Sequence, residues 1–279
     1  MKKIGLALGG GGARGFAHIP ILETLDRFGV KPCVISGTSI GAIIGALYAS
    51  GKSGSQIRAI IDSLHISREK GIRDAVHKAP NLIRGMGFVR PEISRGGLVN
   101  VDRFLKSLID DIGVETFEEL EIPLYAISTC FWRGDEMAIN SGKLFPAIKA
   151  SMAIPGVFAP VKHDGHILVD GGLVNNVPYD VIQDQCDVTI AIDIAPIRLP
   201  SKNTVPGVMD AALGMFDMMV ERVMTDKRKK KEADIYIECG IKDVRVLEFN
   251  KIDDVYEQSQ TAVKELERQL KLKGFVQHS

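Results

Sequence analysis

The chain of 279 residues has no net charge, because 35 lysine and arginine residues balance 35 aspartate and glutamate residues. Without an excess of either sign, no global field attracts nucleic acid or anionic lipid, so we expect no nucleic-acid partner. The sequence also has no run of about 18 apolar residues, so we expect no transmembrane helix. The lysines near its start resemble those of a secretory signal, but glycines interrupt the apolar segment behind them. We therefore expect a cytoplasmic protein with at most a transient, peripheral contact at a membrane.

Cysteine is scarce, and its spacing does not indicate a metal site. The four cysteines lie far apart and form neither a C-x-x-C pair nor a Cys/His cluster: Cys33, Cys130, Cys186 and Cys239. We interpret them as reduced thiols, since two disulfides would require a secreted protein. We expect neither a metal ion nor another cofactor.

The first fifty residues alternate between two patterns. Short apolar runs at 3–8 and 31–36 predict strands, and the residues at 13–28 and after position 39 predict helices. This β-α-β-α order is typical of a parallel sheet covered by helices. Similar patterns continue along the chain, with strands expected at 124–130, 136–139, 166–170, 188–194 and 233–239, and later helices at 206–225 and 253–271.

Residues 53–110 do not fit this alternation. Helical spacing begins at Ile57 but becomes irregular between 65 and 95, where arginine, lysine, glycine and proline are scattered. This segment predicts either a cap or lid, or a set of ordinary connecting helices. We expect a main domain over 3–195 that includes the insertion, and a helical and strand extension over 196–279 packed on the same domain.

Glycine is abundant directly after the first expected strand. The segment Gly10-Gly11-Gly12-Ala13-Arg14-Gly15 formally matches the G-x-G-x-x-G pattern of dinucleotide-binding loops. That function requires an acidic residue near the end of the second strand, where this sequence has serine, glycine and threonine instead. The alternative is an oxyanion hole, because glycine lets backbone N–H groups approach a reacting carbonyl at the positive end of a helix. Arg14 could hold this loop together or contact a phosphate.

A serine stands where the second expected strand meets its helix. Ser39 is the centre of Gly37-Thr38-Ser39-Ile40-Gly41, a G-x-S-x-G segment that exposes a nucleophile at such a turn. Gly37 and Gly41 relieve the crowding of so sharp a turn. A serine that only caps the helix would occupy the same place. The adjacent glycine loop favours the nucleophile, because acyl hydrolysis needs both an exposed serine and an oxyanion cradle.

Histidine, the usual base for such a serine, is poorly placed. Of six histidines, only His278 follows the candidate acid Asp170, and a chain terminus is a poor position for a preorganised base. His163 and His166 flank a turn and are expected at the surface. A Ser-His-Asp triad is therefore disfavoured.

A carboxylate that acts directly on serine is the remaining candidate. Asp170 ends the strand 166–170 and precedes Gly171-Gly172, so it would project from the carboxyl end of a strand, where the sites of α/β proteins lie. The alternative is an ordinary turn aspartate in a hairpin. Asp193 is a rival acid, but no glycine turn flanks it.

Together these segments resemble the patatin-like phospholipases, in particular their short bacterial members. The resemblance covers about residues 3–195 and rests on the glycine loop, the serine turn, Asp170-Gly171-Gly172 and four further segments: 35–39, 46–51, 150–158 and 175–178. It implies a three-layer α/β/α fold with a mainly parallel sheet and with Ser39 on a nucleophile elbow. Gly9 stands where some relatives carry aspartate or serine, and residues 200–279 are much less typical.

The resemblance also implies an activity. Ser39 would be the nucleophile and Asp170 the general base of a catalytic dyad, and the Gly10–Gly15 loop would form the oxyanion hole. The expected reaction is calcium-independent hydrolysis of acyl esters, often phospholipids or lysophospholipids. A thioesterase or acyltransferase would use the same dyad, and a non-catalytic regulator could keep the same fold. The expected partner is a lipid or acyl-ester substrate, and the sequence does not decide between a monomer and a homo-oligomer.

The helix expected over 206–225 is the segment most relevant to membrane contact. Its apolar residues favour one broad face, and the basic run Lys227–Lys231 follows it. This pattern indicates either an interfacial helix with a clamp for lipid headgroups, or a core or dimer helix with a basic end that suits the helix dipole. Asp217 and Glu221 and the zero net charge favour the core or dimer helix. The interfacial alternative predicts that Lys227→Glu and Lys230→Glu weaken vesicle binding.

Overall fold

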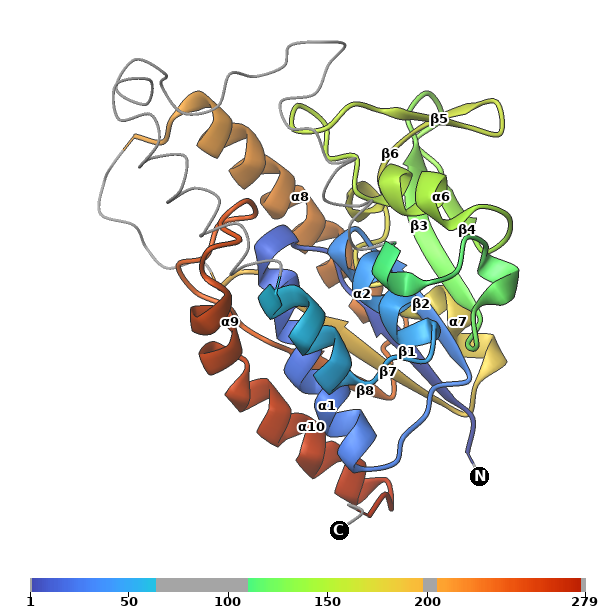
Figure 1. Cartoon of the computed structure of the whole chain (residues 1–279). Helices are drawn as coiled ribbons and strands as arrows, with labels where there is room; N and C mark the ends of the chain where they lie inside the picture. Colours follow the sequence, from blue (N-terminus) through green and yellow to red (C-terminus); the bar gives the residue numbers. More distant parts are fainter. Residues whose placement is uncertain (1, 64–109, 198–204, 277–279) are drawn as a thin grey trace, which may run out of the picture.

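A single mixed sheet forms the centre of the protein. The computed structural model describes residues 2–63, 110–197 and 205–276. Within them the sheet has eight strands, of which seven follow the order β5-β6-β3-β2-β1-β7-β8 and the eighth, β4, pairs with β3 beside this path (Figure 1). The strands are β1 (Ile4–Leu8), β2 (Val34–Thr38), β3 (Leu124–Cys130), β4 (Glu136–Ile139), β5 (Val161–His163), β6 (His166–Asp170), β7 (Val188–Asp193) and β8 (Ile235–Glu238).

Helices connect the strands and cover both faces of the sheet. The labelled α-helices are α1 (His18–Arg27), α2 (Ile40–Ala49), α6 (Leu144–Ser151), α7 (Tyr179–Ile182), α8 (Val208–Lys230), α9 (Ile252–Gln258) and α10 (Gln260–Leu272). Short 3-10 helices are η1 (Gly12–Ala17), η2 (Phe117–Glu119), η3 (Gly171–Leu173) and η4 (Gln183–Gln185). Residues 54–63 form a further helical segment.

The sheet is parallel at its centre and antiparallel at one side. β1 pairs in parallel with β2 and β7, β2 with β3, and β7 with β8. All five residues of β1 and all six of β7 are buried, as expected for parallel strands covered on both faces. The pairings β3–β4, β3–β6 and β5–β6 are antiparallel. The expected three-layer α/β/α class is confirmed, with an antiparallel extension that brings Asp170 beside Ser128.

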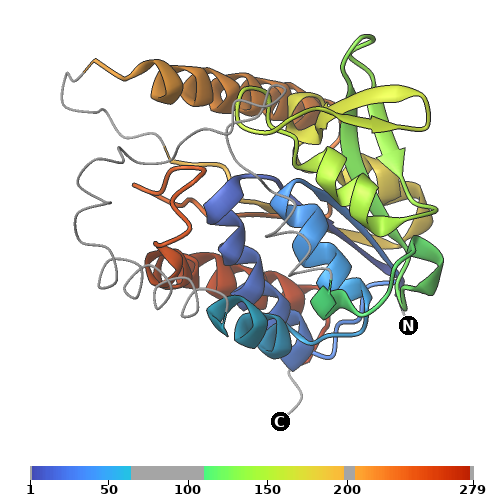
Figure 2. The same ribbon diagram turned by 45° about the horizontal axis from the view of Figure 1, so that its top comes forward.

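Two apolar clusters lie on opposite faces of this sheet. Residues of β1 alternate between them, since Leu6 and Leu8 belong to the larger cluster and Ala7 to the smaller. The larger cluster includes α1, α2 and α10, which Figure 1 shows together with α9 in front of the sheet. The smaller cluster is built from α7 and from Val220 and Met224 of α8. Figure 2 shows α8 along the side of the molecule away from α10.

Several helix boundaries differ from the sequence expectations. The helix expected over 13–28 begins as η1 and becomes α-helical only at His18, because Gly12 has a positive φ of 59° and the tighter segment packs directly on Ile40. The helix expected to end near Thr225 continues through Lys230, so most of the basic run is helical. The expected helix 253–271 is two helices that meet at Ser259.

The cap or lid predicted over residues 53–110 falls mostly on residues 64–109, which lie outside the described residues. In the later part of the chain, β8 extends the sheet beside β7, and α10 packs on α1 and β8. None of the helices in the described ranges has the length and apolar character needed to cross a bilayer.

Candidate active site

Ser39 stands on a sharp turn between β2 and α2. Its φ of 55° and ψ of −124° are unusual for a residue with a side chain, as expected of a strained nucleophile elbow. A Cβ on Gly41 would lie 2.2 Å from the Leu8 carbonyl oxygen, so only glycine fits there. The Ser39 N–H donates to Ser151 Oγ at 2.8 Å, and Ser151 Oγ donates to the Ile127 carbonyl at 2.5 Å. The turn is therefore held by the close packing of Gly41 on β1 and by the hydrogen bond from Ser39 to Ser151.

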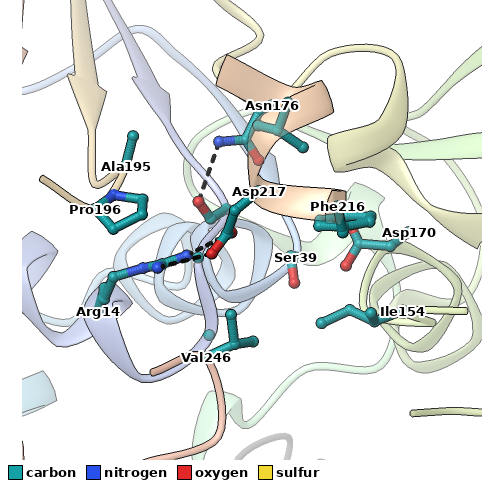
Figure 3. Close-up of a pocket in the computed structure, with 14 residues that line it drawn as sticks. Arg14, Ser39, Ile154, Asp170, Asn176, Ala195, Pro196, Phe216, Asp217 and Val246 are labelled. Carbon is teal, nitrogen blue, oxygen red and sulfur yellow. Dashed lines mark hydrogen bonds and ion pairs between the residues drawn. The ribbon is translucent and has the colours of Figure 1, made fainter. Parts of the chain in front are cut away.

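Asp170 ends β6 and faces the same space as Ser39 (Figure 3). It begins η3 rather than a hairpin, because its Oδ1 accepts the Gly172 N–H at 2.7 Å. Complete burial raises the pKa of this carboxyl to about 7, although the Gly172 N–H and the Ser39 hydroxyl both favour its charged form. The other carboxylate oxygen, Oδ2, has no hydrogen-bond partner among the described residues. A buried carboxylate with a spare oxygen beside a serine is suited to accept a proton.

The glycine loop lines the same cavity as Ser39 and Asp170. Within the described residues, the N–H groups of Gly9, Gly10 and Ala13 already donate to the carbonyls of Ile192, Asn176 and Val246. Gly11 and Gly12 line the same cavity as Ser39, and the described residues offer their N–H groups no acceptor. Of the residues predicted for the oxyanion hole, Gly10 and Ala13 therefore have N–H groups that are already engaged, whereas those of Gly11 and Gly12 are available.

Arg14 has a structural contact rather than a free guanidinium. Its side chain is 3% exposed and forms an ion pair with Asp217 of α8, with nitrogen–oxygen distances of 3.0 and 3.3 Å. Gly15 packs against Ile40, where a Cβ would lie 2.3 Å from the isoleucine side chain. These contacts of Arg14 and Gly15 hold the loop against α8 and α2.

Several residues that line the site were not among the predicted site residues, and they include Asn176, Phe216 and Val246. Asn176 donates from Nδ2 to the Gly10 carbonyl at 3.1 Å and accepts the Gly10 N–H at 3.2 Å. Phe216 of α8 and Val246 line the cavity from the C-terminal part of the chain. The sequence signal for Asn176 was the polar pair after the Asp170-Gly171-Gly172 turn, whereas no local pattern indicated Phe216 or Val246.

The cavity beside Ser39 is small. Its volume is about 20 Å³, which is room for on the order of one water molecule. Phe216 lies over the Asp170 turn, since a Cβ on Gly172 would be 3.3 Å from the edge of its ring. As it stands, the cavity leaves no room for a larger group beside Ser39.

The competing acids and bases lie elsewhere. Asp193 is buried and does not line the cavity, and its two carboxylate oxygens are engaged by the Tyr236 hydroxyl at 2.7 Å and the Ala195 N–H at 2.8 Å. His163 and His166 are half-buried in the β5–β6 hairpin. His18 is fully buried with Nε2 2.8 Å from the Gly9 carbonyl, and burial lowers its pKa to about 4, so it is neutral at pH 7. No described histidine is therefore positioned to activate Ser39.

The basic run at the end of α8 is only partly free. The ammonium of the partly buried Lys227 donates to three oxygens of the 175–180 segment, so it is not free to act as the headgroup clamp that the sequence pattern allowed. Arg228 pairs with Glu232 and Glu238. The alternative of a headgroup clamp therefore does not hold for these two residues, because Asp180 engages Lys227 and the two glutamates engage Arg228.

The fold and site together define an α/β protein with a serine on a nucleophile elbow and a buried aspartate beside it. The family model for patatin-like phospholipases matches residues 6–182, which is more than half of the chain. The chain therefore belongs to the patatin-like phospholipase family, whose members are lipid hydrolases.

Curated relatives agree with this assignment. An uncharacterized NTE family protein of Mycobacterium tuberculosis is 30% identical over 237 residues, which are 81% of this chain and 61% of that protein. Patatin-like phospholipase domain-containing protein 7 of Rattus norvegicus is 35% identical over 197 residues, 68% of this chain and 13% of the rat protein. The chain thus spans less than two thirds of the length of these relatives.

A solved structure supports the fold. The crystal structure of VipD from Legionella pneumophila matches with a TM-score of 0.51 and 12% sequence identity, over 94% of this chain and 66% of that chain. At this identity the likeness concerns the fold alone.

Proposed function

We propose that this protein is a serine acyl-ester hydrolase for lipid esters, of the phospholipase A or lysophospholipase type. The observation that carries the proposal is that Ser39, Asp170, Gly11 and Gly12 line one cavity, and that the described residues offer the N–H groups of Gly11 and Gly12 no acceptor. These are the nucleophile, the base and the oxyanion donors that acyl transfer to serine requires.

The first chemical step forms an acyl-enzyme. Ser39 Oγ attacks the ester carbonyl carbon while its proton passes to Asp170. The tetrahedral oxyanion lies against the N–H groups of Gly11 and Gly12, which are fixed in advance by the bonds of their neighbours to Asn176 and Val246. The intermediate collapses, the carbon–oxygen bond of the ester breaks, and the leaving alcohol takes the proton from Asp170.

The second step releases the fatty acid. A water molecule gives a proton to Asp170 as it attacks the acyl carbonyl, and the same two N–H groups stabilise the second oxyanion. Ser39 Oγ leaves with the proton from Asp170, which restores the starting state.

The surroundings of the cavity support a lipid substrate. Its lining includes the apolar side chains of Ile154, Phe216, Val220 and Val246. The exposed side of α8 carries Met215, Met218 and Met219, each about half exposed. Flexible methionines pack adaptably on apolar ligands. The family name and the names of the relatives point to the same substrate class.

The test compares hydrolysis of p-nitrophenyl esters by the wild type, Ser39→Ala and Asp170→Asn, each checked for folding by circular dichroism. We expect activity in the wild type and a loss of at least about 10³-fold in both variants, because each removes a member of one catalytic unit. Folded Ser39→Ala with wild-type activity would contradict the proposal. Parallel assays with lysophospholipid, phospholipid and acyl-thioester substrates then identify the acyl donor.

A further inference from the structure

The C-terminal half of α8 lies against the segment that follows the Asp170 turn. Only 14% of the Lys227 side chain is exposed. Its ammonium donates to Asn175 Oδ1 at 2.6 Å, to the Val177 carbonyl at 2.9 Å and to Asp180 Oδ1. It also lies 4.1 Å from the centre of the Tyr179 ring. One side chain thus engages four residues of a short segment that is 50 residues earlier in the chain.

The side chain of Asn175 is held at both ends. Its Oδ1 accepts Lys227, and its Nδ2 donates to Glu136 Oε2 at 2.5 Å and to Asp180 Oδ1 at 2.9 Å. Its backbone carbonyl accepts the Thr38 hydroxyl at 2.8 Å. Because Thr38 directly precedes the nucleophile, this network reaches the elbow itself.

Asn176 lies between the two residues that Lys227 holds. The side chain of Asn175 and the carbonyl of Val177 are both fixed by the same ammonium, so the intervening peptide has little freedom to rotate. Asn176 in turn makes two hydrogen bonds with Gly10, since its side-chain Nδ2 donates to the Gly10 carbonyl and its backbone carbonyl accepts the Gly10 N–H. A Cβ on Gly10 would lie 3.2 Å from Ser39 Cβ, which shows how closely this loop approaches the nucleophile.

The network also balances charge. Burial raises the pKa of Glu136 and lowers that of Lys227, while Asp180 and Glu136 favour the charged ammonium. Removal of Lys227 would leave two carboxylates around one amide without a cation. A variant of Lys227 alone can therefore fail for reasons of stability, and the test must separate stability from position.

We propose that Lys227 is a positioning residue for catalysis, which holds Asn175 and Val177 so that Asn176 sets the place of the oxyanion loop at Gly10. The inference rests on the proposed hydrolase function for its kinetic consequence. It assigns this role to a helix outside the part of the chain that the family model matches, residues 6–182.

The test uses the double variant Lys227→Met/Asp180→Asn. The second change removes the carboxylate that would lose its partner, so the folded state keeps its charge balance, whereas Asn175 and Val177 still lose their donor. Lys230→Met is the matched control, because Lys230 is exposed three residues further along α8. Stability is measured by thermal unfolding, and kcat and KM are measured with a short p-nitrophenyl ester.

We expect the double variant to unfold within a few degrees of the wild type but to lose roughly tenfold or more in kcat, with KM changed less than about threefold, because a small displacement of the donors weakens transition-state binding. Lys230→Met should match the wild type. Wild-type kcat in the folded double variant would overturn the proposal, since charge balance would then be the whole role of Lys227.

A second readout does not depend on the substrate. The Gly10 N–H is hydrogen-bonded to Asn176, so its hydrogen exchange reports on the loop directly. We expect the peptide over residues 9–14 to exchange roughly tenfold faster in the double variant than in the wild type and in Lys230→Met. Unchanged exchange would overturn the positioning role. An inactive wild type would contradict the hydrolase proposal instead and would leave the exchange measurement as the test of Lys227.

Discussion

Asp170 is buried, and this determines when it can act as a base. Because burial raises its pKa to about 7, most of the carboxyl is protonated at pH 5 and ionised at pH 8 to 9. A protonated Asp170 cannot accept the proton of Ser39. We expect kcat/KM for a neutral ester to rise with pH and to reach half its maximum near pH 7. A rate that is constant between pH 5 and 9 would mean that Asp170 is ionised throughout or is not the base.

The same burial predicts an effect of Asp170→Asn on stability. The folded pKa lies above the unfolded value of 3.8, so the folded state binds the extra proton between about pH 4 and 7. The carboxyl therefore costs stability as pH rises through this window, and the cost is complete above pH 7. We expect the neutral asparagine to stabilise the fold at pH 8 by on the order of a few kcal/mol, and by much less at pH 4. The check is urea unfolding at both pH values, and equal differences at the two would contradict the pKa shift.

The elbow between β2 and α2 depends on the close approach of α2 to β1. At Gly41 a Cβ would meet the Leu8 carbonyl at 2.2 Å, whereas at Gly45, one turn later, the nearest atoms are side chains at 3.2 Å or more. We expect Gly41→Ala to destabilise the protein by about 2 kcal/mol or more, because the backbone of α2 or of β1 must shift to make room for the methyl group. Gly45→Ala should be tolerated, since alanine favours a helix interior by about 1 kcal/mol over glycine. Thermal unfolding of both variants decides this, and equal stability would contradict it.

Sequence patterns predicted the elements better than their contacts. The strand before Ser39 and the strand that ends at Asp170 follow from short apolar runs bounded by glycine, which are local signals. Asp217 and Lys227 of α8 could not be assigned in this way, because their partners Arg14 and Asn175 lie 203 and 52 residues away. An amphipathic pattern shows that a helix has a buried face but not which charged residues are paired on it.

The complete site requires parts of the chain beyond the region that the family model matches. Val246 accepts the Ala13 N–H at 2.8 Å and lines the cavity, and Asp217 and Phe216 of α8 contact the glycine loop and the Asp170 turn. β8 extends the sheet beside β7, and α10 packs on α1. We therefore propose that residues 196–279 fold as one unit with residues 3–195, rather than as a separable extension.

Leu266 of α10 provides the test of this single unit. Its side chain is fully buried in the cluster that also contains α1 and α2. Truncation of such a leucine to alanine costs about 2 to 5 kcal/mol. In a single unit, Leu266→Ala must lower the urea midpoint of the whole molecule, and helix content and esterase activity must be lost together. If α10 belonged to an independent extension, activity would persist at urea concentrations where part of the helical signal has already gone, and the C-terminal segment would then be an accessory to the site rather than a part of it.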